Sequence, residues 1–311
     1  MKAVILAAGK GTRMRPLTDD TPKPLLPVAG KTIIEHNIEL IKDEVDEIIV
    51  VGGYMIDELE KKFSDRSDIK IVEQEQALGT AHAALQAKEF IDGKTVVMNG
   101  DDIYGEKAVD ALRYDSAVLA SRADEPEKFG VFELEDGKIS GLVEKPENPP
   151  SNLVNIGFYV VQPEFFNLLE NVEKSERGEY EITDAVNEYL IDHEVEFVEA
   201  DKWLPCSYPF QLVEASQEVT DGIEVAETAD VADDVQLEGD VFVGDNAKIG
   251  EGSKISDSAV LEGAKVQGDV KDSVIMNNSE AEADVENIIL REGRKVEKTS
   301  RNSETEIIGE E

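Results

Sequence analysis

Two spacings of hydrophobic residues alternate along the first part of the chain. Short apolar runs, typical of buried strands, occupy residues 3–6, 47–51, 69–72, 95–99 and 116–120. Between these runs isoleucines recur at helical spacing over residues 32–42, and further helices are expected over residues 55–63 and from near Thr80. Strands that alternate with helices favour an α/β fold with a mainly parallel sheet and helices on both faces. Ligands of such sheets bind at the carboxyl ends of the strands.

The pattern changes at about Phe129. Residues 130–134 and 138–143 predict a hairpin whose turn is Asp136-Gly137. A further strand is expected over residues 155–161, and helices over residues 163–169 and 182–191. These elements complete an α/β domain that we expect to cover residues 1–221.

A hexapeptide repeat begins at Val225. Aliphatic residues recur at an unbroken interval of six, at Val225, Val231, Leu237, Val243, Ile249, Ile255 and Leu261. This period is typical of a parallel β-helix, in which each repeat is a short strand and a turn and the aliphatic residue points inward. The register is lost after about Gln267, which predicts two to three coils. We expect the β-helix over residues 222–293 and, because the chain is polar from Arg294 onward, a loose tail over residues 294–311.

Charge and cysteine content exclude several classes of protein. The formal net charge is −38 and is spread along the whole sequence, so nucleic acid and anionic membranes should repel this chain. No apolar run approaches the roughly 18 residues of a membrane span, and the single cysteine, Cys206, excludes an internal disulfide. We therefore expect a cytoplasmic protein. So large a charge favours a halophilic protein of a high-salt cytoplasm, because self-repulsion opposes folding in dilute salt; a merely acidic protein is the alternative.

A glycine-rich segment with two cations follows the first predicted strand. It reads Leu6-Ala7-Ala8-Gly9-Lys10-Gly11-Thr12-Arg13-Met14-Arg15-Pro16 and continues with Pro22-Lys23-Pro24. Such a loop can bring backbone N–H groups close to phosphates, and Arg13 and Lys23 add fixed positive charge. Met14 stands where a dinucleotide fingerprint has its third glycine, and Thr12 follows Gly11 where a P-loop has lysine. A phosphate-binding loop is favoured over an ordinary strand-to-helix turn.

The segment resembles the signature of the sugar-1-phosphate nucleotidyltransferases, Leu-Ala-Ala-Gly-x-Gly-Thr-Arg followed by Pro-Lys. The resemblance implies a Rossmann-like catalytic domain followed by a short left-handed β-helix. It also implies that Arg13 and Lys23 are catalytic, because they offset charge on the α-phosphate and on the leaving pyrophosphate. The residues that it implies as nucleotide-binding in this segment are Leu6, Ala8, Gly9, Gly11 and Thr12.

A second motif stands at the start of a predicted helix and reads Gln74-Glu75-Gln76-Ala77-Leu78-Gly79-Thr80-Ala81-His82. Thr80 is a good N-cap, and Gly79 permits close approach of a ligand. The motif resembles the base-recognition segment of the same family, which implies that Gln74, Gly79 and Thr80 bind a pyrimidine nucleotide. Its Leu-Gly-Thr-Ala-His-Ala form is most similar to the uridylyltransferases.

Two further motifs place charged residues at strand ends. Asn99-Gly100-Asp101-Asp102 follows the fourth predicted strand, where carboxylates suit Mg²⁺, although an Asx turn explains the same residues. The resemblance implies that Asp101 binds the metal. Glu144-Lys145-Pro146 ends a strand, and such a pair is usually exposed to solvent; the resemblance implies a sugar-phosphate site instead. Its residues would be Gly130, Glu144, Lys145, Asn155 and Gly157.

One segment departs from the family pattern. Relatives usually carry Trp-x-Asp near the end of the catalytic domain, where the aspartate is a second metal ligand, whereas this chain has Trp203-Leu204-Pro205. Either Asp101 holds the metal with waters and phosphates, or Asp102 or Asp201 replaces the missing carboxylate. A catalytically inactive relative is the third interpretation.

The resemblance implies a reaction of a nucleoside triphosphate with a sugar-1-phosphate that yields a nucleoside-diphosphate sugar and pyrophosphate, with Mg²⁺ as cofactor. The sugar phosphate is already ionised at neutral pH, so positioning and charge neutralisation suffice without a general base. UTP is the preferred donor, with dTTP second. Glucose-1-phosphate is the preferred acceptor, with N-acetylglucosamine-1-phosphate next.

Two other functions compete with this one. A bifunctional enzyme would also transfer acetyl groups on its β-helix, but such sites normally use a histidine, and His36, His82 and His193 all precede the repeat. A non-catalytic nucleotide-sugar-binding subunit is suggested by Pro205 alone. The short β-helix leaves ends that need capping, which favours a homo-oligomer.

Overall fold

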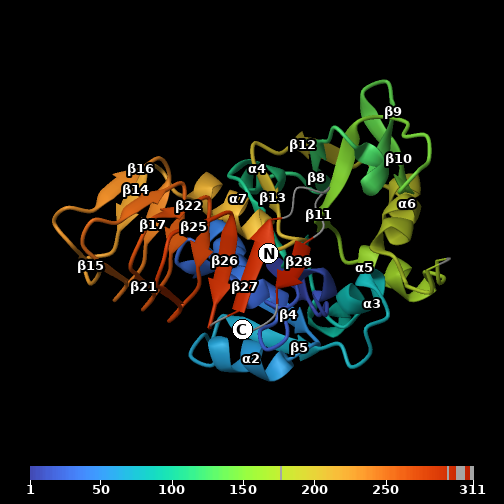
Figure 1. Ribbon diagram of the computed structural model, residues 1–311. Coiled ribbons are helices and arrows are strands. Elements are labelled where there is room, and N and C mark those ends of the chain that lie inside the picture. Colours follow the sequence, from blue (N-terminus) through green and yellow to red (C-terminus); the bar gives the residue numbers. More distant parts are fainter. Residues whose placement is uncertain (176, 293, 299–304, 309–311) are drawn as a thin grey trace. The chain divides into compact units, whose positions relative to one another are not determined.

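The computed structural model describes residues 1–175, 177–292, 294–298 and 305–308 (Figure 1). The chain groups into two compact units. The first consists of Met1–Lys10 and Ile34–Trp203, and the second of Gly11–Ile33 and the chain from Leu204 onward. Among the described residues no helix is both long and apolar enough to span a bilayer.

The first unit is built on a nine-stranded mixed sheet. Four neighbouring strands run parallel, namely β5 (Ile69–Glu73), β4 (Glu47–Gly52), β1 (Lys2–Ala7) and β6 (Thr95–Asn99). The sheet continues with strands that include β11 (Leu153–Val161), antiparallel to β6, then β8 (Ala117–Arg122) and β12 (Glu196–Glu199). The expected α/β fold is confirmed, and each strand predicted for residues 3–161 is present.

Helices occupy connections between these strands. They are α1 (Ile33–Ile41), α2 (Ile56–Lys62), α3 (Thr80–Leu85), α4 (Lys107–Ala111), α5 (Phe165–Leu168) and α6 (Ile182–Asp192). α3 and α6 pack against each other, and Tyr159, Phe165 and Phe166 are fully buried in the same core. The apolar faces of α3, α5 and α6 are therefore buried in one core.

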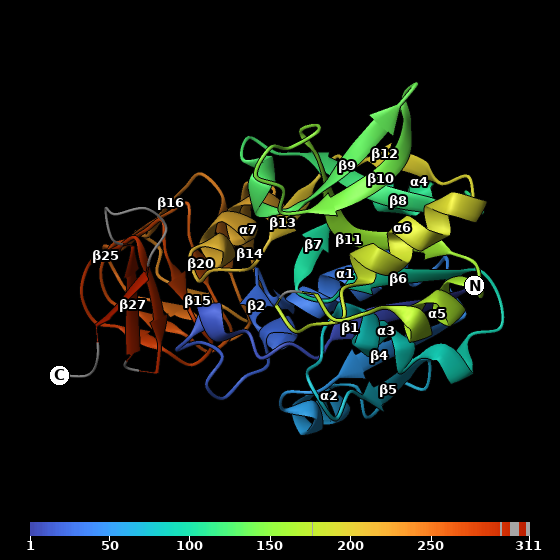
Figure 2. The same cartoon turned by 90° about the vertical axis from the view of Figure 1, so that its right-hand side faces the viewer.

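The predicted hairpin is formed by β9 (Gly130–Glu135) and β10 (Lys138–Glu144), which run antiparallel (Figure 2). Asp136 and Gly137 at its turn both have positive φ, 49° and 80°, as a type I′ turn requires. At the other end of the hairpin Gly130 and Glu144 are partners in register. The hairpin therefore brings two predicted sugar-site residues together.

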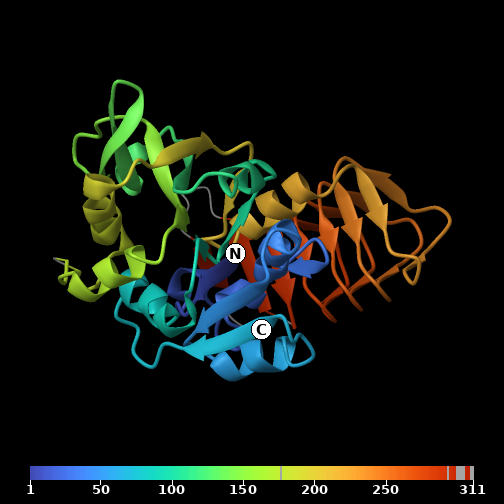
Figure 3. The same ribbon diagram turned by 180° about the vertical axis from the view of Figure 1, so that it is seen from behind.

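The second unit contains the β-helix, whose short strands stack coil on coil (Figure 3). Parallel pairing runs down three faces, as expected for a left-handed β-helix. The strands of the first face are β14 (Ile223–Val225), β17 (Val241–Val243), β20 (Ala259–Val260), β23 (Val274–Ile275) and β26 (Ile288–Arg291). Those of the second are β15 (Asp230–Val231), β18 (Lys248–Ile249), β21 (Lys265–Val266) and β24 (Glu280–Ala281). Those of the third are β16 (Gln236–Glu238), β19 (Lys254–Ser256), β22 (Val270–Lys271) and β25 (Val285–Glu286).

Successive coils become shorter along the β-helix. Gly222 and its hydrogen-bond partner Asp240, one coil later, are 18 residues apart in the chain, whereas Ser273 and its partner Ile288 are 15 residues apart. The described strands complete four coils, β14–β16, β17–β19, β20–β22 and β23–β25, before β26. The prediction of two to three coils was wrong, because a repeat of six no longer matches once the coil has shortened.

Polar residues in left-handed backbone close one corner of the β-helix. Asp257, Asp272 and Asn287 recur once per coil and have φ of 47°, 46° and 55°. Short polar side chains tolerate this conformation because they hydrogen-bond locally. Beside this corner the Ser273 hydroxyl accepts a hydrogen bond from the N–H of Ile288 at 3.1 Å. Consecutive coils are therefore joined by side-chain bonds as well as by the strand ladders.

The interior of the β-helix follows the repeat. Val243, Ile249 and Ile255 are all buried, as the inward orientation predicts. Val225 differs, because its side chain is 43% exposed on the first coil. β14 pairs with β17 alone among the described strands, so one side of the first coil has no neighbouring coil there.

Part of the expected tail is folded. β27 (Arg294–Lys298) runs antiparallel to β26, and β28 (Thr305–Ile308) antiparallel to β27. The expectation of a loose tail was wrong for these residues, because Val296 supplies an apolar side chain that is 1% exposed. Residues 299–304 and 309–311 of that tail lie outside the described residues.

Candidate active site

The carboxyl end of β1 leads into the glycine-rich segment. Leu6 and Ala8 are buried, whereas Gly9 and Lys10 are exposed. The N–H of Gly100 donates to the carbonyl of Leu6 at 2.9 Å, so the ends of β1 and β6 lie together. A Cβ on Gly9 would meet no atom within 4 Å. The space beside Gly9 is therefore open to a ligand.

Asp101 and Asp102 follow β6 in different environments. The Asp102 carboxylate is buried and accepts a hydrogen bond from the indole Nε1 of Trp203 at 3.2 Å. The Asp102 carbonyl accepts another from Asn37 Nδ2 at 2.7 Å. Asp101 is only partly buried. Asp101 is therefore the more accessible of the two carboxylates, and Asp102 is fixed by its neighbours.

Asp201, one of the two carboxylates considered as a replacement at position 205, has a structural partner. Its Oδ1 accepts a hydrogen bond from the Lys107 N–H at 3.0 Å, at the start of α4, where a carboxylate stabilises unpaired N–H groups. No group of three or more His, Cys, Asp or Glu side chains is arranged to hold a metal ion in the described part of the chain. Mg²⁺ usually takes one or two carboxylates and fills its other positions with waters and substrate phosphates. Asp101 beside Asp102 fits that mode of binding.

The predicted base-recognition segment is fixed against the start of α6. Gln74 is 5% exposed, and its Nε2 donates to the carbonyl of Gly79 at 3.1 Å and lies 2.9 Å from His82 Nδ1. Gly79 has φ of 114°, and a Cβ there would lie 2.5 Å from the carbonyl oxygen of Tyr180. The Tyr180 backbone therefore requires glycine at this position, a reason that is independent of any ligand.

Thr80 is the first residue of α3, and Gly79 is its N-cap. The Thr80 hydroxyl accepts a hydrogen bond from the Ile182 N–H at 3.0 Å, at the first residue of α6. The prediction that Thr80 caps its own helix was wrong, because the hydroxyl satisfies an unpaired donor of the neighbouring helix. The segment thus ties α3 to α6.

The predicted sugar-site residues gather at the end of β10. A Cβ on Gly130 would lie 3.1 Å from Glu144 Oε2 and 3.5 Å from the Cβ of Asn155. The Asn155 Oδ1 accepts a hydrogen bond from the Gly157 N–H at 3.0 Å, and its Nδ2 donates to the Tyr159 hydroxyl at 2.7 Å. Gly130 therefore lies against Glu144 and Asn155, and Gly157 is hydrogen-bonded to Asn155. Four of the five predicted residues form one cluster.

Lys145, the fifth, has a strained backbone. Its φ is 45°, and its N–H donates to the carbonyl of Phe129 at 3.0 Å. Left-handed backbone costs a non-glycine residue about 1 to 2 kcal/mol, and strain of this kind clusters at functional sites. The Lys145 Nζ lies 3.4 Å from Glu144 Oε1. A strained backbone and an ion pair with Glu144 therefore occur together at Lys145.

Arg177 is a candidate site residue that sequence reasoning missed. Its Nη2 lies 3.1 Å from Glu144 Oε1 and 3.0 Å from Glu181 Oε1. The residue stands alone in a hydrophilic stretch without periodicity, Glu176-Arg177-Gly178-Glu179, which motif reading passes over. The available signal was a single cation among acidic residues. Lys145 and Arg177 together place two positive charges beside one carboxylate.

Tyr104 is a second residue that the sequence did not single out. Its buried hydroxyl donates to the carbonyls of Ile156 at 2.8 Å and Gly157 at 3.2 Å. Burial raises the pKa of the Tyr104 phenol well above its usual value, and the charges of Asp102 and Asp101 raise it further. The hydroxyl therefore stays protonated and supports the backbone of the sugar-site cluster.

The remaining predicted residues lie in the second unit, within Gly11–Ile33. Thr12 and Arg13 are exposed on the 3₁₀ turn Thr12–Met14, and the Arg13 guanidinium carbon lies 5.9 Å from the ring centroid of Tyr208. Lys23 is 6% exposed. The Thr18 hydroxyl donates to the Gly11 carbonyl at 2.8 Å. This bond closes the loop that carries Arg13.

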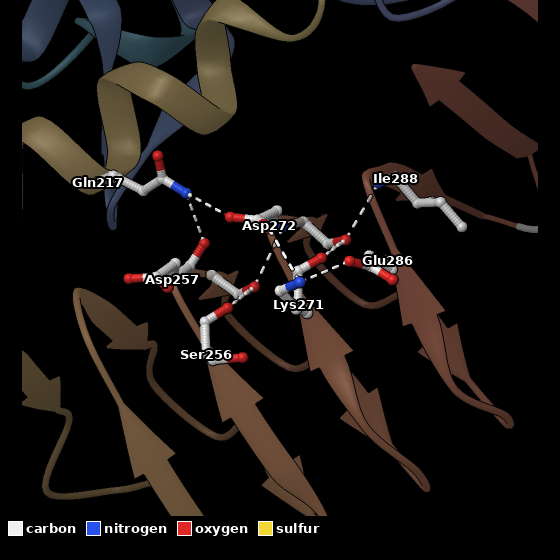
Figure 4. Close-up of polar contacts among 9 residues, drawn as sticks. Gln217, Ser256, Asp257, Lys271, Asp272, Glu286 and Ile288 are labelled. Carbon is white, nitrogen blue, oxygen red and sulfur yellow. Dashed lines mark hydrogen bonds and ion pairs between the residues drawn. The ribbon is translucent and has the colours of Figure 1, made fainter. Parts of the chain in front are cut away.

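A polar pocket of about 320 Å³ lies in another part of the second unit. Its lining consists of Gln217, Glu218, Thr220, Asp240, Asp257 and Asp272. Figure 4 shows Gln217, on α7 (Gln211–Val219), reaching the carbonyl of Asp257 and the carboxylate of Asp272. Because these carboxylates would repel an anionic substrate, and because none of the lining residues belongs to the predicted site, we assign this pocket no part in it.

Comparison with known proteins adds sequence relatives. The profile of the nucleotidyl transferase family matches residues 2–222. Bifunctional protein GlmU of Methanococcus maripaludis is 43% identical over 227 residues, which are 72% of this chain and 55% of that protein. The UTP–glucose-1-phosphate uridylyltransferase AglF of Haloferax volcanii is 36% identical over 236 residues, 71% of this chain and 97% of that protein. The chain thus spans about half the length of the GlmU relative.

Solved structures agree with the sequence relatives. The structure of a UDP-glucose pyrophosphorylase complexed with UDP-glucose matches with a TM-score of 0.61 and 26% identity, over 70% of this chain and 97% of that one. Sequence profile, relatives and fold therefore indicate the same group of proteins. The chain belongs to the nucleotidyl transferase family, among the sugar-1-phosphate nucleotidyltransferases.

Proposed function

We propose that this protein transfers a nucleotidyl group from a nucleoside triphosphate to a sugar-1-phosphate and releases pyrophosphate. The observation that carries the proposal is the cluster at the end of β10, where Lys145 Nζ and Arg177 Nη2 lie 3.4 Å and 3.1 Å from Glu144 Oε1. A carboxylate accepts hydrogen bonds from sugar hydroxyls, and two cations beside it suit a phosphate. Two cations at one carboxylate stand out in a chain with a net charge of −38, and Glu181 Oε1 pairs with one of them, Arg177, at 3.0 Å.

The proposed chemistry is an in-line displacement at the α-phosphorus. An oxygen of the sugar phosphate forms the new bond, and the bond to the leaving pyrophosphate breaks. The attacking oxygen is already ionised at neutral pH, so Lys145 and Arg177 need only orient the acceptor. Arg13 and Lys23 neutralise charge on the α-phosphate and on the pyrophosphate, and losing one such interaction costs about 3 kcal/mol of barrier.

The proposed nucleotide contacts come from two motifs. The backbone of the glycine-rich segment would hold the triphosphate, and the segment from Gln74 to Thr80 would hold a pyrimidine base. UTP is the proposed donor and dTTP the second choice, and the Haloferax volcanii relative supports this order because its name specifies UTP. The residues concerned are Leu6, Ala8, Gly9, Gly11, Thr12, Gln74, Gly79 and Thr80.

Glucose-1-phosphate is the proposed acceptor, and N-acetylglucosamine-1-phosphate the second choice. Glu144 and Lys145 would contact it directly. Both ends of the Asn155 amide already have protein partners, Gly157 and Tyr159. Asn155 and Gly157, with Gly130, would therefore act mainly by shaping the pocket.

Mg²⁺ is the proposed cofactor. Asp101 would hold it, with Asp102 beside it, and the ion would supply positive charge to the phosphates. Pro205 offers no carboxylate, and Asp201 is engaged at the start of α4. We therefore propose that Asp101 is the principal protein ligand and that substrate phosphates and waters complete the coordination.

The test is a matrix of four nucleoside triphosphates against several sugar-1-phosphates in molar KCl, with pyrophosphate release as the readout. Turnover should require Mg²⁺, stop on addition of a chelator and return with excess Mg²⁺. Asp101→Asn should abolish turnover even with excess Mg²⁺, whereas Asp201→Asn should keep both turnover and its dependence on Mg²⁺. Binding of a triphosphate without any turnover would contradict the proposal and favour the non-catalytic subunit that Pro205 suggests.

We further propose a homo-oligomer and a requirement for high salt. The exposed first coil of the β-helix, with Ile223 51% and Val225 43% exposed, supports a covered end. The net charge of −38 supports the salt requirement, because self-repulsion is screened more fully as the salt concentration rises. Light scattering tests the proposed homo-oligomer, and unfolding measured across a KCl series tests the proposed salt requirement.

We also propose that residues 1–221, 222–293 and 294–311 are functional parts of the chain: the catalytic domain, the β-helix and a polar tail.

A further inference from the structure

β26, the last strand of the first face of the β-helix, is bonded to the proposed phosphate-binding segment, Gly11–Ile33. Arg291, the last residue of β26, donates from Nη1 to the carbonyl of Leu17 at 2.5 Å and from Nη2 to the Thr21 hydroxyl at 2.8 Å. Its Nη2 also lies 2.6 Å from Asp20 Oδ1. The Arg291 side chain is 19% exposed, so solvent screens this ion pair less than a fully exposed one. One guanidinium therefore holds three points within residues 17–21.

The first of these points, Leu17, lies next to a residue that is bonded to the proposed catalytic loop. Thr18 follows Leu17 in the chain, is fully buried, and donates from its hydroxyl to the Gly11 carbonyl at 2.8 Å. A Cβ on Gly11 would in turn lie 3.0 Å from the Cβ of Lys23. The path from Arg291 to Gly11 and Lys23 therefore consists of consecutive bonds and packed atoms.

A second contact holds the other end of the same segment. Phe242, on β17, lies against the turn at Gly30, where a Cβ would be 2.4 Å from the ring carbon Cζ. Gly11–Ile33 thus touches the β-helix at two separated coils and belongs to the same compact unit. Arg291 differs from Phe242 in its chemistry, because its planar fork binds carbonyl, hydroxyl and carboxylate oxygens in fixed directions.

We propose that the β-helix positions the phosphate-binding segment through Arg291, which makes Arg291 a positioning residue for the nucleoside triphosphate. The inference rests on the proposed function and adds a role for the repeat in it. Without the guanidinium, residues 17–21 lose these three contacts and keep a longer ion pair, from Arg294 Nη1 to Asp19 Oδ2 at 3.9 Å. Arg13 and Lys23 then occupy their working positions for less of the time. Displacement of about 1 Å far from the chemistry can lower a rate by about 100-fold.

The test compares Arg291→Ala and Arg291→Lys with a matched control. Lys271→Ala is the control, because Lys271 on β22 forms an exposed ion pair with Glu286, 2.6 Å away, and has no contact with residues 11–33 among its described ion pairs. We expect Arg291→Ala to raise the KM for UTP about tenfold and to leave the KM for the sugar-1-phosphate unchanged. Arg291→Lys should have a KM for UTP between those of Arg291→Ala and the unsubstituted protein, since an ammonium group cannot reproduce the planar fork of a guanidinium. The control should match the unsubstituted protein.

Equilibrium binding of UTP with Mg²⁺, without sugar-1-phosphate, separates the possible failures. If the unsubstituted protein binds no triphosphate, the proposed function fails. If it binds UTP and Arg291→Ala binds equally well, the positioning role alone is overturned. Should Arg291→Ala not fold, Asp20→Asn combined with Thr21→Val removes two of its partners from the other side. That variant should then show the same selective loss of UTP affinity, and unchanged affinity would overturn the inference.

Discussion

Replacing Gly157 by alanine tests the packing of the sugar-site cluster. Gly157 has φ of 72°, and a Cβ there would lie 2.1 Å from Asn99 Nδ2. Two unfavourable terms add. The left-handed backbone costs about 1 to 2 kcal/mol, and forcing a packed side chain aside costs about 1 to 3 kcal/mol. We expect the free energy of unfolding to fall by about 2 to 5 kcal/mol.

Gly137→Ala separates the two terms. Gly137 has φ of 80°, similar to that of Gly157, but a Cβ there would meet no atom within 4 Å. Only the backbone term applies, so the expected loss is about 1 to 2 kcal/mol. Denaturant titration in molar KCl, extrapolated linearly to zero denaturant, measures both variants under the same conditions.

The kinetics of the two variants should also differ. Gly157 belongs to the proposed sugar site, so Gly157→Ala should raise the KM for the sugar-1-phosphate, whereas Gly137→Ala should keep the original kinetics. Combining Gly157→Ala with Asn99→Ala should recover the steric part of the lost stability, which a double-mutant cycle isolates. Equal destabilisation by Gly157→Ala and Gly137→Ala would refute the reasoning, because it would show that Asn99 does not occupy that space.

Three further predictions concern separate parts of the molecule. Arg13→Ala should lower kcat/KM by about 100-fold with an unchanged unfolding midpoint, since the side chain is exposed; activity near the original level would remove Arg13 from the mechanism. Tyr104→Phe should lower the free energy of unfolding by about 1 to 3 kcal/mol, because two buried carbonyls lose their donor; a neutral result in denaturant titration would contradict that account. Ile255→Ala, at a fully buried position of the β-helix, should cost about 2 to 5 kcal/mol, and calorimetry that found no loss would show that this interior is loosely packed.

The α/β part of the fold was readable because burial there follows simple spacings. The runs at 47–51 and 95–99 coincide with β4 and β6, since strands of a sheet covered on both faces must be apolar throughout. The hairpin was equally clear, because Asp136-Gly137 suits few backbone conformations other than a tight turn. Local chemistry and tertiary structure agree at these places.

The end of the β-helix was hidden by a change of spacing. The inward residues there follow one another at uneven intervals of four, five, six and four positions, at Val266, Val270, Ile275, Ala281 and Val285. Each face nevertheless keeps its own register, because Val266 still pairs with Ala281 and Val270 with Val285 on the next coil. A search for intervals of six cannot find such a coil, whereas a search at the length of the whole coil can.

Residues of the site were predictable where they belong to a motif and hidden where only tertiary structure gives them a role. The sequence alone could not show whether Asp201 is a metal ligand or a structural residue. Its hydrogen bond with the Lys107 N–H identifies a structural role. Arg177 lies 33 residues from its partner Glu144 in the chain, and Tyr104 lies 53 residues from Gly157. Partners at such distances leave no trace in local sequence patterns.

The discontinuous second unit has a consequence for synthesis of the chain. Gly11–Ile33 is synthesised before the rest of its unit, which begins only at Leu204, and Arg291 follows 258 residues after Ile33 (291 − 33). At about 5 to 20 residues per second, that interval lasts roughly 10 to 50 s. During this interval the nascent chain carries Gly11–Ile33 without its contacts to Arg291. Ribosome-bound fragments that stop before residue 291 should therefore bind nucleotide more weakly than fragments that extend beyond it.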